Sequence, residues 1–195
     1  MAGEISLPHD FQESLAKSRA QEDAPWWPHV YRTAFPDLIS MPSVRQDGWA
    51  QRGGIDRVLT LASGKTLTVD EKVRHKDYGD VLLEFWSVWR GSYPKGKGEK
   101  AGWVALDLSC DFIAYAIVPT QRCLLLPFTT LRRAWRKHHR EWVQLGQRET
   151  EGFYISKAEN RGYQTISVCV PEERLLAALR DAMVVTWDER PRHAA

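Results

Sequence analysis

The chain has 195 residues and a formal net charge of +2, and 43% of its residues are hydrophobic and 27% charged. This length supports one domain with a real hydrophobic core, and the composition is ordinary for a soluble globular protein. The sequence holds no apolar run of membrane-spanning length, and its first residues include acids and lack an apolar core. We therefore expect a cytoplasmic protein without a membrane span or a secretory signal.

The first half of the chain is predicted to contain helices followed by strands. Asp10 is suited to cap a helix that runs to about Glu22, and residues 29–35 form a second short helix before a proline. Apolar and β-branched residues then predict three strands, at residues 55–62, 65–74 and 81–89. Nothing in the Gly- and Lys-rich segment 91–101 would bury an apolar face, so we expect a mobile loop there.

The second half continues the α/β pattern. Its expected elements are strands at residues 111–119 and 122–128, a helix at 128–143, a hairpin formed by residues 153–159 and 163–171, and an amphipathic helix at 171–183. Residues 188–195 are expected to fray. We predict one domain over residues 1–195, with its core at about 10–140 and the late hairpin and helix, about 150–185, added to it.

The small net charge does not by itself indicate a nucleic-acid partner, but the charge is unevenly distributed. Residues 132–140 contain five Arg or Lys and two His without an acid, and residues 90–100 are Gly-rich and mostly basic. Nine tryptophans are many for this length. Most are expected to fill the core, whereas an exposed one beside the basic helix would be suited to stacking on a base.

The three cysteines, Cys110, Cys123 and Cys169, are odd in number, widely spaced, and within or beside apolar segments. This arrangement favours buried thiols in a reducing compartment, because a zinc site needs closely spaced ligands. The sequence also lacks a Ser-His-Asp order, a P-loop and a Rossmann glycine pattern.

The hairpin at residues 55–74 carries charge where a purely structural hairpin would not. A three-residue Ala-Ser-Gly turn, with Gly64 in the left-handed conformation, would set Asp56 directly opposite Asp70. Their Cβ atoms would lie roughly 5 Å apart, which is destabilising for like charges unless a cation lies between them. Mg²⁺ takes carboxylate oxygens, and Lys72, on the same face as Asp70, would assist an attacking water or stabilise charge on a phosphate.

This prediction depends on the turn. With a two-residue turn, Asp56 would face Glu71 instead. The alternative interpretation is a solvated edge hairpin with charged ends, and the spacing alone leaves both interpretations open.

Two short motifs stand on neighbouring strands of this hairpin: Ile55-Asp56, then Asp70-Glu71-Lys72. Together they resemble the active-site signature of the PD-(D/E)XK nuclease superfamily, with Ile in place of the usual Pro. The flanking segments QRGGIDR and DVLLEFWS, and later CDFIAYAIVP and LLPFTTLRRAW, are similar to those of Holliday-junction-resolvase-like and phage-encoded members. The resemblance covers roughly residues 10–140.

What the resemblance implies is an α/β fold with a restriction-endonuclease-like core, in which helices flank a mixed sheet of four to five strands. A metal ion, Mg²⁺ or Mn²⁺, would be held by Asp56 and Asp70 at the splayed edge of this sheet, and Lys72 would be the catalytic lysine. Glu71 points to the opposite face by alternation, so it would supply only its backbone carbonyl to the metal.

The superfamily often adds a glutamate from the first helix. Glu22 fits this role better than Glu13, because it lies at the helix end nearest the turn toward the sheet. Glu84 would be either a further acid near the metal or a solvent-facing residue, and Ser87 lies where some resolvase-like members carry a polar residue. Nucleic-acid contacts are expected from the basic residues Arg74, Lys76, Lys95, Lys97, Arg132, Arg133, Arg136 and Lys137.

Three functions are compatible with these observations. The first is a metal-dependent nuclease, either an endonuclease or an exonuclease, that hydrolyses phosphodiester bonds of DNA. The second is a nuclease-fold accessory protein of a phage or mobile element that binds DNA or protein without cutting. The third is an unrelated α/β protein with a charged hairpin. The complete Asp-Asp-Lys set favours the first, while the form of the substrate and formation of a homodimer stay open.

Overall fold

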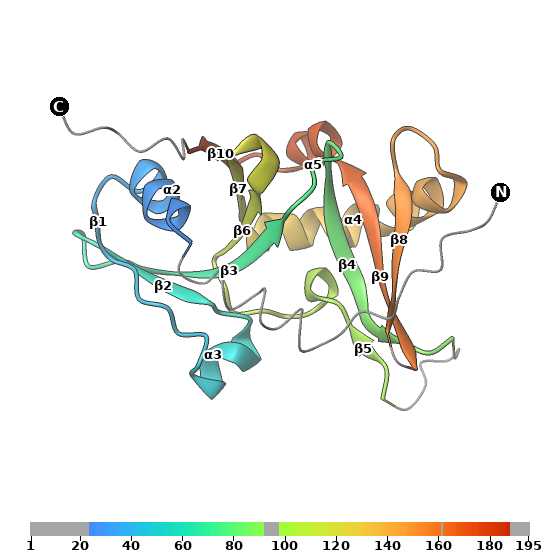
Figure 1. The fold of residues 1–195 in the computed structure, drawn as a ribbon, viewed down its shortest axis with the longest axis horizontal. Coiled ribbons are helices and arrows are strands. Elements are labelled where there is room, and N and C mark those ends of the chain that lie inside the picture. Colours follow the sequence, from blue (N-terminus) through green and yellow to red (C-terminus); the bar gives the residue numbers. More distant parts are fainter. Residues whose placement is uncertain (1–23, 92–97, 161, 188–195) are drawn as a thin grey trace.

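The computed structural model describes residues 24–91, 98–160 and 162–187. In this part of the chain the strands form two β-sheets, and the helices pack against them (Figure 1). The protein is therefore mixed α/β, as the sequence predicts. The helix expected from Asp10 to Glu22, most of the 91–101 loop and the tail at 188–195 lie outside the described residues.

The larger sheet has six strands in the order β1-β2-β3-β6-β7-β10. Their bounds are Leu38–Ser40 for β1, Arg57–Leu61 for β2, Thr66–Arg74 for β3, Phe112–Ile117 for β6, Arg122–Pro127 for β7 and Met183–Thr186 for β10. Within this sheet β3 and β6 run parallel, and the other neighbouring pairs are antiparallel. The strands predicted around the two motifs and in the 111–128 segment are thus confirmed.

The smaller sheet is antiparallel and has the order β5-β4-β9-β8. Its strands are Asp80–Trp89 for β4, Lys100–Ala101 for β5, Tyr154–Asn160 for β8 and Tyr163–Pro171 for β9. The late hairpin is confirmed as β8 and β9. The strand predicted at residues 81–89 is confirmed as β4. It lies in this second sheet because the second edge of β3 pairs with β6, and β4 pairs with β9.

The helices of the described residues are α2 (Trp26–Ala34), α3 (Gly48–Gly53), α4 (Phe128–Arg148) and α5 (Glu172–Ala178), with two 3₁₀ turns, η1 (Trp103–Ala105) and η2 (Val118–Thr120). α2 begins before the expected residue 29. Pro28 does not prevent this, because it lies in the first turn, where a backbone N–H has no intrahelical partner to lose. α4 confirms the predicted basic helix and extends it to Arg148.

The predicted helix at residues 171–183 is shorter than expected. α5 ends at Ala178, and the following segment forms β10, which pairs with the open edge of β7. The β-branched pair Val184 and Val185 favours a strand, and this pairing buries Val185 and Trp187. The sequence patterns also gave no indication of β1, α3 and β5, which are all too short to show a period.

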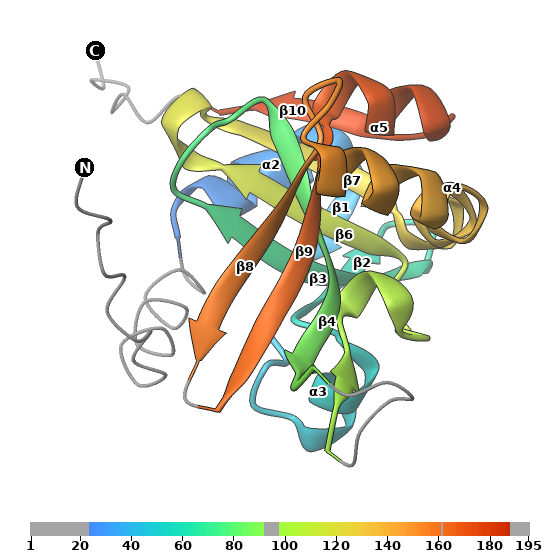
Figure 2. The same ribbon diagram turned by 90° about the vertical axis from the view of Figure 1, so that its right-hand side faces the viewer.

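The larger sheet separates two hydrophobic cores. On one face, α2 packs Trp27 and Tyr31 against Leu59 and Val69. On the other face lie β4, β9, α4 and α5, which Figure 2 shows gathered on one side of the larger sheet. Side chains alternate between the two faces of a strand, and Val69 faces α2. Asp70 and Lys72 therefore point to the other face, into the space between the two sheets.

The three cysteines are free and buried, as predicted. Of the nine tryptophans, four are buried, four are half-buried and one, Trp49, is exposed. Most of these indoles therefore contribute to packing, as expected. Among the helices of the described residues, none is both long and apolar enough to cross a membrane.

Candidate metal and catalytic site

The β2–β3 hairpin has the register that the three-residue turn predicts. Arg57 pairs with Val69, and the turn ends in Gly64 with φ at +80°, the left-handed conformation expected of it. The alternative turn, which would have set Asp56 against Glu71 in the ladder, is thereby excluded.

Asp56 lies just outside β2, where the ladder ends. Its N–H donates to the Val69 carbonyl at 2.8 Å, and its Oδ2 accepts a hydrogen bond from the Glu71 N–H at 2.7 Å. The carboxylate thus takes the place of a backbone carbonyl and lies within hydrogen-bonding reach of the Asp70 carboxyl. Gly54, with φ at +64°, ends α3 and turns the chain into this position.

Asp70 and Lys72 form an ion pair between the two sheets. Lys72 Nζ lies 2.5 Å from Asp70 Oδ1, and the exposed fraction of the side chain is 5% for Asp70 and 32% for Lys72. Burial raises the pKa of Asp70 to about 6, against the lowering effect of Lys72, and the neighbouring Asp56 carboxylate also raises it. Burial lowers the pKa of Lys72, but the surrounding carboxylates outweigh this and raise it.

Glu84 of β4 reaches the same place from the smaller sheet. Its charge is one of those that raise the pKa of Lys72. Burial raises the pKa of Glu84 itself, although the charge of Lys72 and a hydrogen bond with Ser87 both lower it. The Trp103 ring completes the surroundings, with its centroid 5.9 Å from Lys72 Nζ. The structure therefore brings Glu84 and Ser87 into the neighbourhood of Asp70 and Lys72.

The close approach of η1 to β4 depends on Gly102. Its N–H donates to the Phe85 carbonyl at 2.9 Å, and a Cβ at this position would lie 2.3 Å from the Glu84 carbonyl oxygen. Only glycine fits here, and its fit allows Trp103 to lie beside Lys72. Sequence reasoning missed this residue, because it is one of several glycines in a Gly-rich segment.

The Glu71 side chain lies on the opposite face of β3, under α2. It accepts hydrogen bonds from the Tyr31 hydroxyl at 2.7 Å, Arg57 Nε at 2.6 Å and Arg45 Nη2 at 3.0 Å. Arg45 also lies 3.3 Å from Asp56 Oδ2 and so links the two acids. The Glu71 side chain is thus committed to a buried structural network, which leaves its backbone carbonyl as the only group it can turn to a metal.

Within residues 24–91, 98–160 and 162–187, no group of three or more His, Cys, Asp or Glu side chains is arranged to hold a metal ion. The predicted Glu22 lies outside these residues. Asp56 and Asp70 nevertheless fit Mg²⁺ chemistry, because this ion is commonly held by one or two carboxylates and completes its shell with water and substrate phosphate. The Asp56 carboxylate is one of the groups that raise the pKa of Asp70.

The predicted nucleic-acid contacts on β3 and the following loops are not equivalent. The Arg74 guanidinium is held inside the protein, where it donates to the Tyr115 hydroxyl at 3.0 Å and pairs with Asp80 at 3.0 Å. It therefore links β3 to β4 and β6 and is not presented to a phosphate in this structure. Lys76 is exposed, and Lys95 and Lys97 lie outside the described residues.

α4 presents the other basic residues. Arg133, Arg136 and Lys137 are exposed, whereas Arg132 is half-buried and forms an ion pair with Asp107. Arg132 therefore ties α4 to the segment that follows η1, whereas the other three predicted contacts face solvent, as does Arg140 of the same helix.

Comparisons with models of known protein families, with curated proteins and with solved structures gave no match. The resemblance to PD-(D/E)XK nucleases thus stays a prediction based on the hairpin motifs.

Proposed function

We propose that this protein is a metal-dependent nuclease that hydrolyses phosphodiester bonds of DNA. The observation that carries the proposal is the convergence of Asp56, Asp70 and Lys72 at one end of the β2–β3 hairpin. Carboxylate oxygens are the ligands that Mg²⁺ takes, and a lysine beside them suits the negative charge that develops on a phosphate during hydrolysis.

Each residue has a role in this proposal. Asp56 and Asp70 hold Mg²⁺ or Mn²⁺, with the Glu71 carbonyl as a further donor. The ion, when bound, polarises the phosphate as a Lewis acid. Lys72 orients the attacking water or donates to a phosphoryl oxygen as its charge grows, and Glu84 on the opposite sheet helps to hold the ammonium group in place.

The proposal includes a restriction-endonuclease-like core. Support comes from the hairpin that carries the motifs, from β6 running parallel beside β3, and from elements packed on both faces of the larger sheet. It also includes a cytoplasmic location, because the three free, buried thiols suit a reducing compartment.

A nucleic-acid-binding accessory protein without cleavage activity is the second candidate. The exposed Arg133, Arg136 and Lys137 favour contact with phosphate groups, and such contacts would serve a binding protein as well as a nuclease. Binding alone therefore does not separate the two candidates, and cleavage does.

The test is incubation of the full chain with labelled duplex, single-stranded, flap and four-way-junction DNA in Mg²⁺, Mn²⁺ or EDTA. We expect cleavage with either ion, none in EDTA, and cleavage by Lys72→Ala that is slower by a few hundredfold. Lys65→Ala is the matched control, because Lys65 is an exposed lysine at the other end of the same hairpin. If neither ion supports cleavage of any of these DNAs, the nuclease proposal fails, and binding without cutting would favour the accessory protein.

A further inference from the structure

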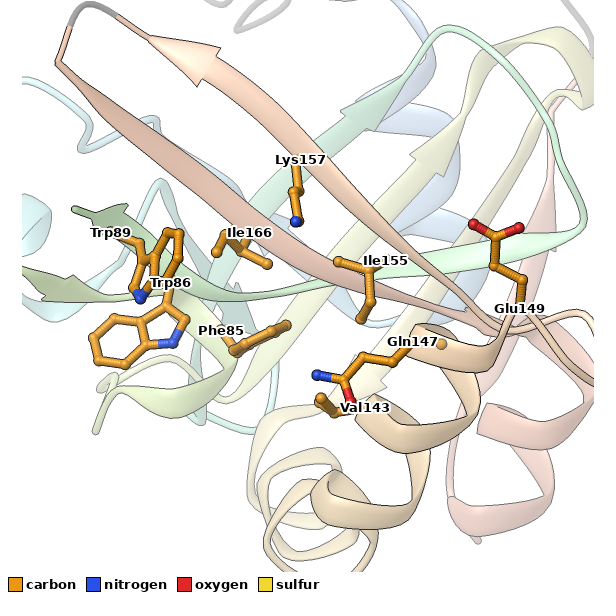
Figure 3. Close-up of a pocket in the computed structure, with 10 residues that line it drawn as sticks. Phe85, Trp86, Trp89, Val143, Gln147, Glu149, Ile155, Lys157 and Ile166 are labelled. Carbon is orange, nitrogen blue, oxygen red and sulfur yellow. The ribbon is translucent and has the colours of Figure 1, made fainter. Parts of the chain in front are cut away.

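A trough of about 600 Å³ lies between α4 and the smaller sheet (Figure 3). Its lining includes Phe85, Trp86 and Trp89 of β4, Val143 of α4, and Ile155 and Lys157 of β8. We call it the aromatic trough. Its volume lies within the range of about 300–1,000 Å³ that is typical of pockets for organic ligands, so it is large enough for a nucleobase.

The aromatic trough combines flat rings with one cation. Figure 3 shows the Trp86 and Trp89 indoles gathered at one end. Phe85 is fixed from behind, because it stacks on Trp135 of α4 with ring centroids 5.9 Å apart. Lys157 is exposed and brings a positive charge to the lining, which also includes the Glu149 carboxylate and the Gln147 amide nearer the end of α4. Rings for stacking and a nearby cation are the features that sequence-tolerant sites for single-stranded nucleic acids share.

β4 connects the aromatic trough to the candidate catalytic site. Glu84 and Ser87 belong to the surroundings of Lys72, whereas Phe85, Trp86 and Trp89 line the trough. Register shifts on both sides of Trp86 break the regular alternation of this strand. Such irregularities re-aim side chains, so one strand serves two sites on its two sides.

We propose that the aromatic trough binds an unpaired base of the nucleic-acid strand whose phosphate lies at Asp56 and Asp70. This inference rests on the proposed nucleic-acid substrate. A base inside a duplex has both faces covered by its neighbours, whereas an unpaired base can stack on an indole. The inference thus defines the substrate as DNA with a single-stranded segment or a splayed end.

The test compares the full-length wild type with Trp89→Leu. This change keeps position 89 apolar but removes its indole ring. Trp49→Leu is the matched control, because Trp49 is exposed on α3 and does not line the trough. Binding of a labelled dodecathymidine, an abasic dodecamer and a twelve-base-pair duplex is measured by fluorescence anisotropy in EDTA, so that no strand is cut. Thermal unfolding of each variant establishes that it is folded.

We expect Trp89→Leu to weaken binding of dodecathymidine roughly tenfold, with binding of the abasic strand and of the duplex unchanged. Trp49→Leu should bind all three probes as wild type does. Lys157→Glu, a surface change, should weaken dodecathymidine binding even if Trp89→Leu does not fold. Equal binding of the thymidine and abasic strands by wild type, or unchanged binding by both trough variants, would overturn the inference.

The outcomes also separate this inference from the nuclease proposal. If wild type cuts DNA with Mg²⁺ but the trough variants bind and cut single strands as well as wild type, the trough inference fails and the nuclease proposal stands. If the trough variants lose binding but wild type cuts nothing, the nuclease proposal fails and the trough inference stands. Absence of nucleic-acid binding in EDTA together with absence of cleavage in Mg²⁺ would end both.

Discussion

Lys72 Nζ lies 2.5 Å from Asp70 Oδ1, yet the pKa of Asp70 is raised rather than lowered. Burial outweighs the lysine, and the Asp56 carboxylate adds to the effect of burial. A solvent-exposed ion pair would lower the pKa of its acid, because it carries little of the desolvation cost that Asp70 bears here. This site instead holds its acid in a state that a further cation would relieve.

The first prediction concerns Lys72. Lys72→Ala should lower the cleavage rate by a few hundredfold, corresponding to ~3–4 kcal/mol of lost transition-state stabilisation, because the group nearest the developing charge is gone. DNA affinity should change little, since one cation among many contributes little to binding. Single-turnover cleavage and equilibrium binding in EDTA measure the two effects. A variant that cuts as fast as wild type would contradict the assigned role.

The second prediction concerns pH. The pKa of Asp70 is about 6 in the folded protein and 3.8 in a model peptide, so folding favours the protonated acid. As pH rises from about 4 to about 6, the unfolded chain loses this proton first and stability falls, by roughly 3 kcal/mol at most. Below about pH 4 and above about pH 6, Asp70 no longer makes the free energy of unfolding depend on pH. Urea unfolding at several pH values between about 4 and about 6 measures this loss of stability.

Asp70→Asn removes this titration. In metal-free buffer the variant should therefore be more stable than wild type at pH 7, by on the order of 1–3 kcal/mol, with the difference vanishing near pH 4. Added Mg²⁺ should stabilise wild type and not the variant, which should also be unable to cut DNA. Equal stability of the two proteins at both pH values would show that ionisation of Asp70 does not destabilise the folded protein.

The third prediction separates Glu71 from Asp70. The Glu71 side chain is fully buried and is held by Arg45, Arg57 and Tyr31. Glu71→Gln leaves two cations near the core without this acid and should destabilise the protein by roughly 3 kcal/mol. Because the backbone carbonyl remains, cleavage per folded molecule should stay within a few-fold of wild type. Loss of cleavage in a folded Glu71→Gln protein would mean that the side chain takes part in the reaction.

The hairpin could be predicted from sequence because its determinants are local. Alternation, a three-residue turn and a left-handed Gly64 set the register without help from the rest of the chain. The partner of β4 could not be predicted in this way. Whether this strand continues the larger sheet or starts a second one depends on which segment takes the free edge of β3, and that is decided by β6, about 40 residues later.

The surroundings of the site show the same division. Asp56, Asp70 and Lys72 follow from spacing, whereas Arg45 and Gly102 come from segments without a period or a motif. Their positions become apparent only when the loop after β1 and the turn before η1 are folded against the hairpin and β4. Contacts between distant segments of this kind have no signature in a single sequence.

The fourth prediction tests the close contact at Gly102. Gly102→Ala would place a Cβ 2.3 Å from the Glu84 carbonyl oxygen, a backbone atom that cannot move aside independently. The variant should lose about 1–3 kcal/mol of stability through this overpacking and should shift Trp103 away from Lys72. Gly48→Ala is the control, because its nearest neighbour is a flexible Arg52 side-chain atom at 3.6 Å. It should be neutral or slightly stabilising in α3.

The fifth prediction concerns three of the exposed cations of α4. Arg133, Arg136 and Lys137 face solvent, so changing them to Glu should spare the fold, whereas Arg132 is excluded because it pairs with Asp107. Each phosphate contact that is lost removes the release of a counterion. The plot of log affinity against log salt should therefore become less steep by about one for each contact.

Lys65→Glu is the control for this series, because it makes the same change of charge at an exposed position on the β2–β3 turn, outside α4. A general effect of net charge would weaken binding by this variant as much as by any single α4 variant. If the contact is specific to α4, the salt slope should change for the α4 variants and not for Lys65→Glu. If the slope is the same for wild type and for the triple variant, this face of α4 does not touch DNA, and the phosphate backbone must be held by other cations.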